Sequence, residues 1–139
     1  MKQTVPFDES AFQPYLGSGT ANIVGSAFLK TQGGDVKVGA GDRVELIPST
    51  PYTAERFGIA TSGMRIEARD GRLQRYIRTT LADAQGNFEF RNIPAGSYFL
   101  ACTITWQYAS QFGALTSGGQ AIAPVTVRDS ETEKVVLTK

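Results

Sequence analysis

The sequence predicts an all-β fold, and two observations support this prediction. Residues 79–100 have the pattern strand, tight turn, strand, Pro-Gly corner, strand, with Asp83 and Gly86 in the turn and Pro94 and Gly96 at the corner. Aspartate can hydrogen-bond the backbone of its own turn, and glycine supplies a positive φ angle. The composition agrees: of the 139 residues, 41% are hydrophobic and 15 are glycine, as expected of a globular β-protein.

Residues 1–20 are expected to form an extended lead-in, and residues 21–139 a single domain of ordinary size. Pro6 and Pro14 prevent a long helix in the lead-in. Its apolar side chains can lie against the sandwich or against a neighbouring domain; they are Phe7, Phe12, Tyr15 and Leu16.

Alternating apolar residues and turn residues place the strands of the domain. Strands are expected at residues 22–30, 36–38, 43–48, 75–81, 120–127 and 134–137, besides those within residues 79–100. Val44 and Leu46 should point inward, and the strand that contains them should end at Pro48, because proline cannot donate a ladder hydrogen bond.

The segment 49–75 is longer than a strand connection requires. A short helix is predicted from Pro51 to Gly58, with Thr50 as its cap. Residues 59–72 leave two alternatives, a loop with one helical turn or an extra hairpin at Asp70-Gly71. Because long loops often bind ligands, this segment is the first candidate for a binding surface.

Arginines are concentrated in the same segment. Arg65, Arg69 and Arg72 have the spacing of one helix face, which would suit an acidic partner or would simply be solvated. Tyr52 and Arg56 complete this part of the candidate surface.

A second unusual segment, residues 106–119, is aromatic, uncharged and rich in glycine. Trp106 and Tyr108 can stack on a sugar ring or grip an apolar side chain of a partner, with Gln107 and Gln111 donating hydrogen bonds. The alternative is that these rings close one end of the sandwich.

Charge and residue content exclude several functions. A net charge of +1 argues against nucleic-acid binding. The absence of histidine removes Ser-His-Asp and Cys-His catalysis and histidine-ligated zinc, and the carboxylates are explained as turn formers or outward strand residues. The only cysteine, Cys102, shares the parity of core residues and should pack as a small hydrophobe. We therefore expect no catalytic site, cofactor or metal.

Motifs distributed along most of the chain resemble those of the carboxypeptidase regulatory-like domain. They are the glycine-containing strand at residues 23–27, the turn and strand at residues 40–46, and the sequence from Asp83 to Leu100, in which Phe88, Phe90, Ile93, Tyr98 and Leu100 occupy the matching positions. The resemblance implies a seven-stranded Greek-key β-sandwich of the prealbumin-like group, here with a short helical insertion. The transthyretin-like hydrolase of the same fold group depends on histidines and a C-terminal motif that this chain lacks.

The resemblance also implies a non-catalytic accessory module of an exported protein that presents loops to a protein partner. A periplasmic or cell-envelope location, as in a lipoprotein, would then require a leader that residues 1–10 do not show; a cytoplasmic protein is the alternative. The second functional hypothesis is a carbohydrate-binding module that uses Trp106, Tyr108, Tyr52 and Tyr76. No apolar run is long enough to span a membrane, and a monomer is expected.

Overall fold

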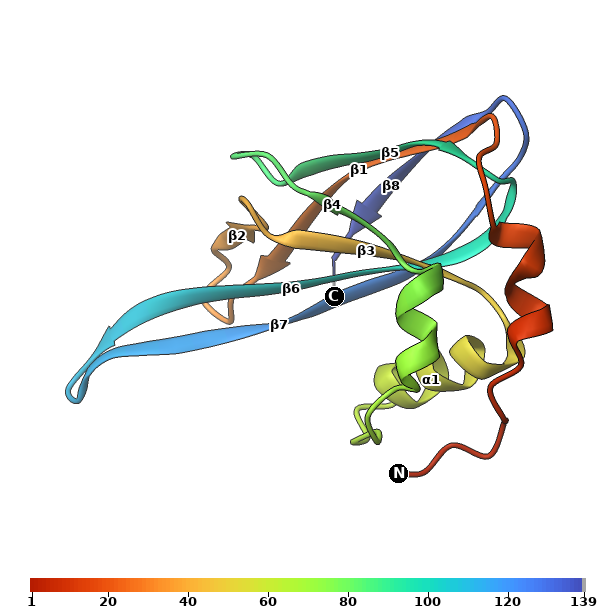
Figure 1. Cartoon of the computed structure of the whole chain (residues 1–139). Helices are drawn as coiled ribbons and strands as arrows, with labels where there is room; N and C mark the ends of the chain where they lie inside the picture. The colour runs from red at the N-terminus through yellow and green to blue at the C-terminus, as the bar shows by residue number, and fades with distance from the viewer. Residues whose placement is uncertain (139) are drawn as a thin grey trace.

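The structure, a computed structural model, describes residues 1–138 and consists mainly of strands (Figure 1). Two four-stranded sheets pack as a β-sandwich. The strands are β1 (Ala21–Lys30), β2 (Val36–Val38), β3 (Arg43–Pro48), β4 (Arg78–Leu81), β5 (Asn87–Ile93), β6 (Gly96–Ser110), β7 (Gly113–Val127) and β8 (Thr132–Leu137). The helices are α1 (Pro51–Thr61) and two short 3-10 helices, η1 (Glu9–Tyr15) and η2 (Gly71–Tyr76). The all-β prediction is confirmed, but residues 1–138 contain eight strands instead of seven.

The first sheet is built around β1. β5 pairs antiparallel with β1 over Ala21–Ser26, and β8 pairs in parallel with β1 over Asn22–Ala27. β2 pairs antiparallel with the last residues of β1, Phe28–Lys30. Gly25 in β1 lies opposite Phe88 of β5, and a Cβ on Gly25 would be 2.7 Å from the Phe88 ring. The same Cβ would collide with the Val135 carbonyl oxygen, so packing of this ring requires glycine.

The second sheet has the strand order β4-β3-β6-β7, with antiparallel neighbours throughout. Val44 and Leu46 point inward and are fully buried, as predicted. They belong to the main core between the sheets, whose largest fully buried members are Ile23, Leu46, Ile93, Tyr98, Leu100, Ile104 and Leu137.

The turn chemistry predicted for residues 79–100 is confirmed. The Asp83 carboxylate accepts hydrogen bonds from the amides of Gln85 and Asn87, both at 2.9 Å, and Gly86 has φ +83°. Gly96 has φ +153°, and a Cβ there would lie 2.9 Å from the Tyr15 ring. Glycine at the corner therefore lets the lead-in pack against the start of β6.

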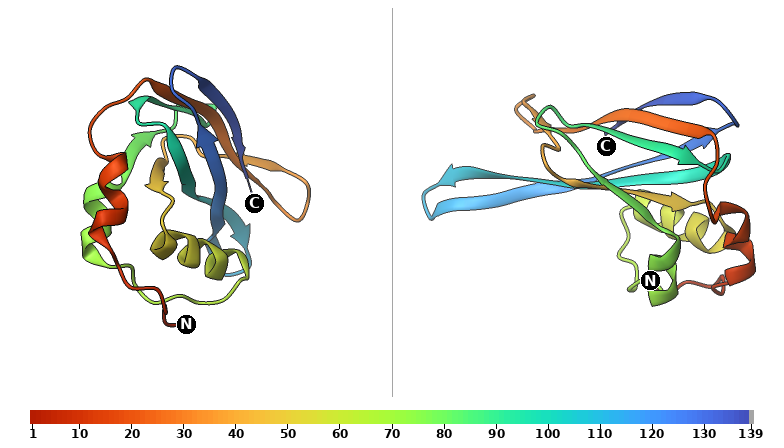
Figure 2. Two further views of the ribbon diagram at one scale, coloured as in Figure 1. Left: turned by 90° about the vertical axis from the view of Figure 1, so that its right-hand side faces the viewer. Right: turned by 45° about the horizontal axis from the view of Figure 1, so that its top comes forward.

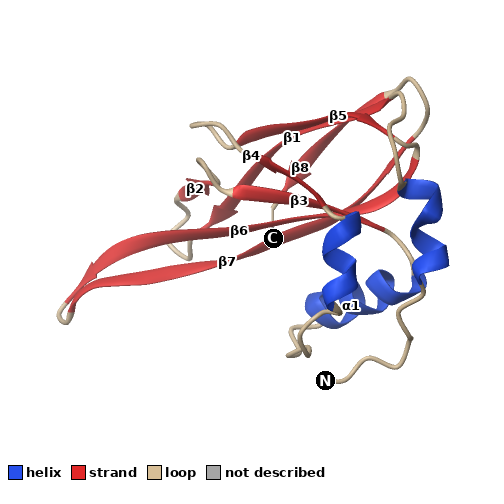
Figure 3. Ribbon diagram, in the orientation of Figure 1, coloured by secondary structure: helices blue, strands red, loops and turns tan. Residues whose placement is uncertain are grey.

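All helical segments gather at one end of the sandwich, as Figure 3 shows. We call residues 1–20 and 49–76 the helical end. The prediction of an extended lead-in is wrong over Glu9–Tyr15, where Asp8 caps η1 by accepting a hydrogen bond from the amide of Ser10 at 3.0 Å. Phe12 of η1 is fully buried in a second cluster with Tyr52 and Leu73.

Helix α1 begins as predicted but ends later. Thr50 and Thr53 form a capping box, and the helix passes through Gly58 to Thr61. A single glycine costs only about 1 kcal/mol in a helix, and the chain leaves the helix near Gly63, which has φ +79°. The alternative hairpin at Asp70-Gly71 is not formed, because Asp70 instead caps η2, and β4 therefore starts at Arg78.

At the opposite end, β6 and β7 continue past the sandwich as a two-stranded hairpin (Figure 2). We call residues 103–120 the arm. The sequence analysis places residues 106–119 outside the strands. In the structure, the residues up to Ser110 belong to β6 and those from Gly113 onward belong to β7, and the two strands pair. Gly113, the residue after Gln111-Phe112, has φ +98°, as in hairpins where a type I turn is followed by a glycine in the left-handed conformation.

Candidate functional site

The inner face of the arm carries exposed aromatic side chains. Alternate residues of β6 point to the same side, so Trp106 and Tyr108 follow the buried residues Cys102 and Ile104 along one face. Tyr108 is 47% exposed, and its cross-strand partner Leu115 is 38% exposed. The core face of the sandwich therefore continues into the arm as an uncovered aromatic surface.

Trp106 lies where this surface meets the sandwich. One part of the ring packs against the main core, and the ring also lines a hollow of about 390 Å³. The hollow is bounded by Phe28, Leu29, Lys30, Trp106, Gly118, Gly119 and Thr138. Small residues face the indole across the arm, since Ser117 is its direct partner, and the glycines leave space above it.

The arm has a further property that bears on its ligands. The chain carries no Asp, Glu, Lys or Arg between Arg91 and Arg128, so no charged residue belongs to the arm. Lys30 and Thr138 provide a cation and a hydroxyl at the edge of the hollow. The surface can thus offer flat apolar contact with hydrogen-bonding groups at one side. Gln107, predicted to donate hydrogen bonds beside Trp106, lies on the opposite face of the arm by strand alternation.

The other predicted site residues belong to the helical end, and most are engaged in internal contacts. Tyr52 is buried, and its hydroxyl accepts a hydrogen bond from the Asp70 amide at 2.8 Å. Arg56 donates to the Gln3 side chain at 2.8 Å and to the Glu67 carbonyl at 3.1 Å. These two residues stabilise the helical end instead of lining an open surface.

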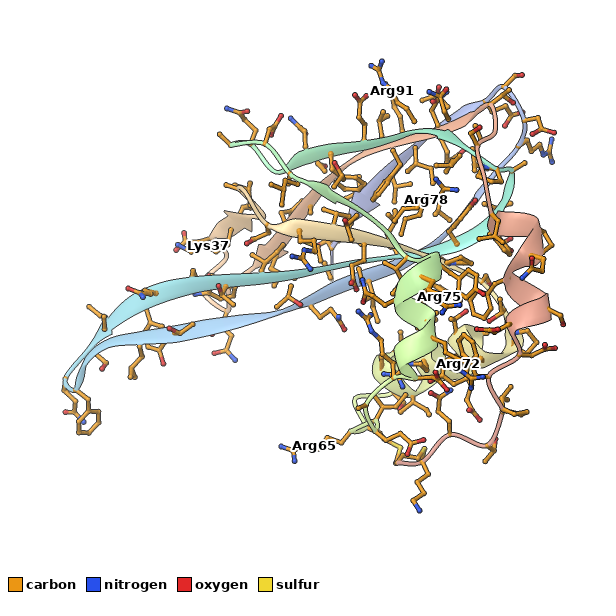
Figure 4. The ribbon with its side chains drawn as sticks, viewed as in Figure 1. Lys37, Arg65, Arg72, Arg75, Arg78 and Arg91 are labelled. Carbon is orange, nitrogen blue, oxygen red and sulfur yellow. The ribbon has the colours of Figure 1, made fainter. Side chains whose placement is uncertain are left out.

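The three arginines expected to share a helix face do not. Arg65 and Arg69 lie in an irregular loop and Arg72 in η2. Arg69 makes a bidentate contact with Glu45 at 3.1 and 3.2 Å. Arg72 pairs with Asp70 at 2.8 Å, which raises its pKa, and it lies 4.6 Å from the centre of the Phe7 ring. Arg65 is exposed and points away from the ribbon in Figure 4.

A feature that the sequence analysis missed is a groove between α1 and the outer face of the second sheet. The Phe57 ring stacks on Phe99 at 4.4 Å, and the groove of about 140 Å³ beside them is edged by Glu45, Arg69 and Gln120. Ile47 in β3 and Phe99 in β6 are apolar although they occupy outward positions of their strands. This pattern in the sequence indicates that another element covers this face of the sheet.

Titratable groups in the core are held in their neutral forms. Burial raises the pKa of Cys102 to about 11 and that of Tyr98 to about 12. The Tyr98 hydroxyl donates to the Pro94 carbonyl at 2.6 Å. Both side chains therefore act as packing groups at neutral pH.

Within residues 1–138, no group of three histidine, cysteine or acidic residues is placed to hold a metal ion. None of the helices in that range has the length and apolar character needed to cross a bilayer.

No protein-family model matches the chain, and a search of curated proteins found no match. Among solved structures, the chain is similar to one from Pseudomonas aeruginosa described as "a putative carbohydrate binding protein". The two share 28% sequence identity with a TM-score of 0.82, over 96% of this chain and 97% of the other. The likeness thus includes the helical end and the arm as well as the sandwich.

Proposed function

We propose that this protein is a carbohydrate-binding module and that the sugar lies on the inner face of the arm. The observation that carries the proposal is the position of Trp106, which lines a hollow while Tyr108 continues the same face outward. Side chains two residues apart in a strand are separated by about 6.6 Å, so both rings can contact one extended ligand.

The chemistry of the surface suits a sugar. A pyranose ring has an apolar face of C–H groups, which packs on an aromatic ring, and a rim of hydroxyls that need polar partners. Trp106 and Tyr108 would supply the flat surface, and Lys30 and Thr138 the hydrogen bonds. The description of the Pseudomonas aeruginosa structure supports the same class of ligand.

At the level of the whole chain, we propose a non-catalytic accessory module of an exported or cell-envelope protein. Its support is the resemblance of residues 23–27, 40–46 and 83–100 to the carboxypeptidase regulatory-like domain. The prealbumin-like Greek-key assignment is part of this proposal.

A protein partner at the helical end is the second candidate function. The exposed guanidinium groups of Arg65 and Arg75 favour it, because their side chains project from the surface there. Arg65→Glu should weaken capture of an acidic partner in crosslinking from the source cell and leave sugar binding unchanged.

Tryptophan fluorescence tests the carbohydrate proposal directly, since Trp106 is the only tryptophan. We expect neutral oligosaccharides, such as malto- and chito-oligosaccharides, to shift its emission and to protect it from acrylamide quenching. Titration calorimetry should show at least tenfold weaker binding for Trp106→Ala and Tyr108→Ala.

Phe112→Ala is the matched control, because this ring is 81% exposed at the tip of the arm and away from the hollow. It should bind like the wild type. An emission maximum that no oligosaccharide in a broad panel moves, together with the absence of calorimetric heat, would refute the proposal.

A further inference from the structure

The arm has an open strand edge. β3 pairs with β6 only from Tyr98 to Cys102, whereas β7 pairs with β6 from Gly96 to Ser110. On the β3 side, residues 103–110 therefore have no strand partner within residues 1–138. Figure 2 shows this edge leaving the body of the sandwich.

Exposed edges are normally protected, and this one is not. Proteins place charges, prolines or bulges on open edges to prevent pairing with another chain. Residues 103–110 contain none of the charged types and no proline. Thr105, Trp106 and Tyr108 instead have high β-propensity, so the edge is well suited to accept a further strand.

We propose that the arms of two copies of this chain pair edge to edge through residues 105–110 of β6. Antiparallel pairing of identical strands obeys a two-fold axis, so each copy offers the other the same surface. The pairing brings no like charges together, because the arm has none, and the net charge of +1 adds little repulsion between copies. This proposal replaces the monomer expected from the sequence.

Two structural arguments favour β6 over β7 as the pairing edge. β7 contains Gly113, Gly118 and Gly119 in the arm, and glycine-rich strands specify register poorly. A second copy also completes a four-stranded sheet from two hairpins, whereas an isolated two-stranded hairpin is only marginally stable.

The pairing has a consequence that rests on the proposed carbohydrate function. A two-fold axis perpendicular to the plane of the shared sheet keeps the same face of both arms on one side. Trp106 and Tyr108 of each copy would then form one continuous aromatic platform for a long glycan. The self-association itself does not depend on that function.

Sedimentation velocity over a range of concentrations tests the pairing. The shared edge is short, so a weak, concentration-dependent dimer is expected. Gln107→Lys places a positive charge on the pairing edge of both copies, so the two like charges repel. It should raise the dissociation constant of the dimer about tenfold. Thr116→Lys is the matched control, because Thr116 is the cross-strand partner of Gln107 on β7, is equally exposed, and should leave the dimer intact.

The location can be checked by hydrogen exchange. The alternate amides of residues 105–110 that point to the open edge should gain protection as the protein concentration rises, while those of the β7 strand in the arm should not. A wild type that stays monomeric to millimolar concentration overturns the proposal. So does a dimer that resists Gln107→Lys, or one that both lysine variants weaken equally. None of these outcomes bears on sugar binding, which the Trp106→Ala titration measures separately.

Discussion

The helical end and the arm both extend beyond the sandwich, but they are held in place differently. The helical end is fixed by side chains: Phe12 stacks on Tyr76 at 4.6 Å, and Arg69 reaches Glu45 in β3. The arm is held mainly by its backbone ladder, and its aromatic residues Tyr108 and Phe112 face solvent. The segment rich in charge is thus the one bonded internally, while the uncharged segment is the one left free to bind.

The largest effect expected from this contrast concerns two phenylalanines. Phe12→Ala should lower the free energy of unfolding by about 3–5 kcal/mol, because Phe12 is fully buried and leaves a cavity. Phe112→Ala should change it by less than about 0.5 kcal/mol. Urea denaturation measures both. If both variants lost a similar free energy of unfolding, side-chain packing would stabilise the helical end and the arm equally. That result would contradict the contrast described above.

A smaller effect is expected at the start of α1. Thr50→Ala removes the side chain that caps the helix and should cost about 1 kcal/mol in urea denaturation. Thr61→Ala, at the exposed far end of the same helix, should cost less than about 0.5 kcal/mol. A larger loss of stability for Thr61→Ala than for Thr50→Ala would mean that contacts at the C-terminal end, and not the cap, stabilise the helix.

The smallest effect is a pH dependence confined to the helical end. The Thr4 hydroxyl, with the amides of Thr4 and Val5, lowers the pKa of Glu55 from 4.5 to about 2. Because the folded pKa is the lower one, these contacts stabilise fully above pH 4.5 and are lost as the pH falls through 2.

The amide NMR shifts of Thr4 and Val5 should therefore titrate with a midpoint near 2, and Glu55→Gln should abolish the transition. Amides of the arm should not respond, since the arm has no carboxylate. A midpoint near 4.5 would mean that Glu55 does not hold the lead-in.

What could be predicted from the sequence was local. Asp83, Gly86 and Gly96 determine their own turns, and Thr50 caps the helix that follows it, so the residue types alone indicate the geometry. The inward positions of Val44 and Leu46 follow from strand alternation in the same way.

What could not be predicted depends on partners far along the chain. Nothing near Arg69 in the sequence indicates that its guanidinium meets Glu45, and nothing near Phe12 indicates a shared cluster with Tyr52 and Leu73. In the arm both faces are largely exposed, so apolar alternation, the main signal of a strand, is weak there. Trp106 and Tyr108 were identified as candidates by residue type, and the structure supplied their position.

The parallel pairing of β1 with β8 has a consequence for biosynthesis. Asn22–Ala27 of β1 pairs with Thr132–Leu137, so this edge of β1 stays open until residues 132–137 have been synthesised, more than 100 residues later. Pairings between segments so distant in sequence slow folding, because the intervening chain must be ordered first. A nascent chain that lacks β8 would expose the main core beside β1, and we expect it to depend on chaperones until β8 has been synthesised.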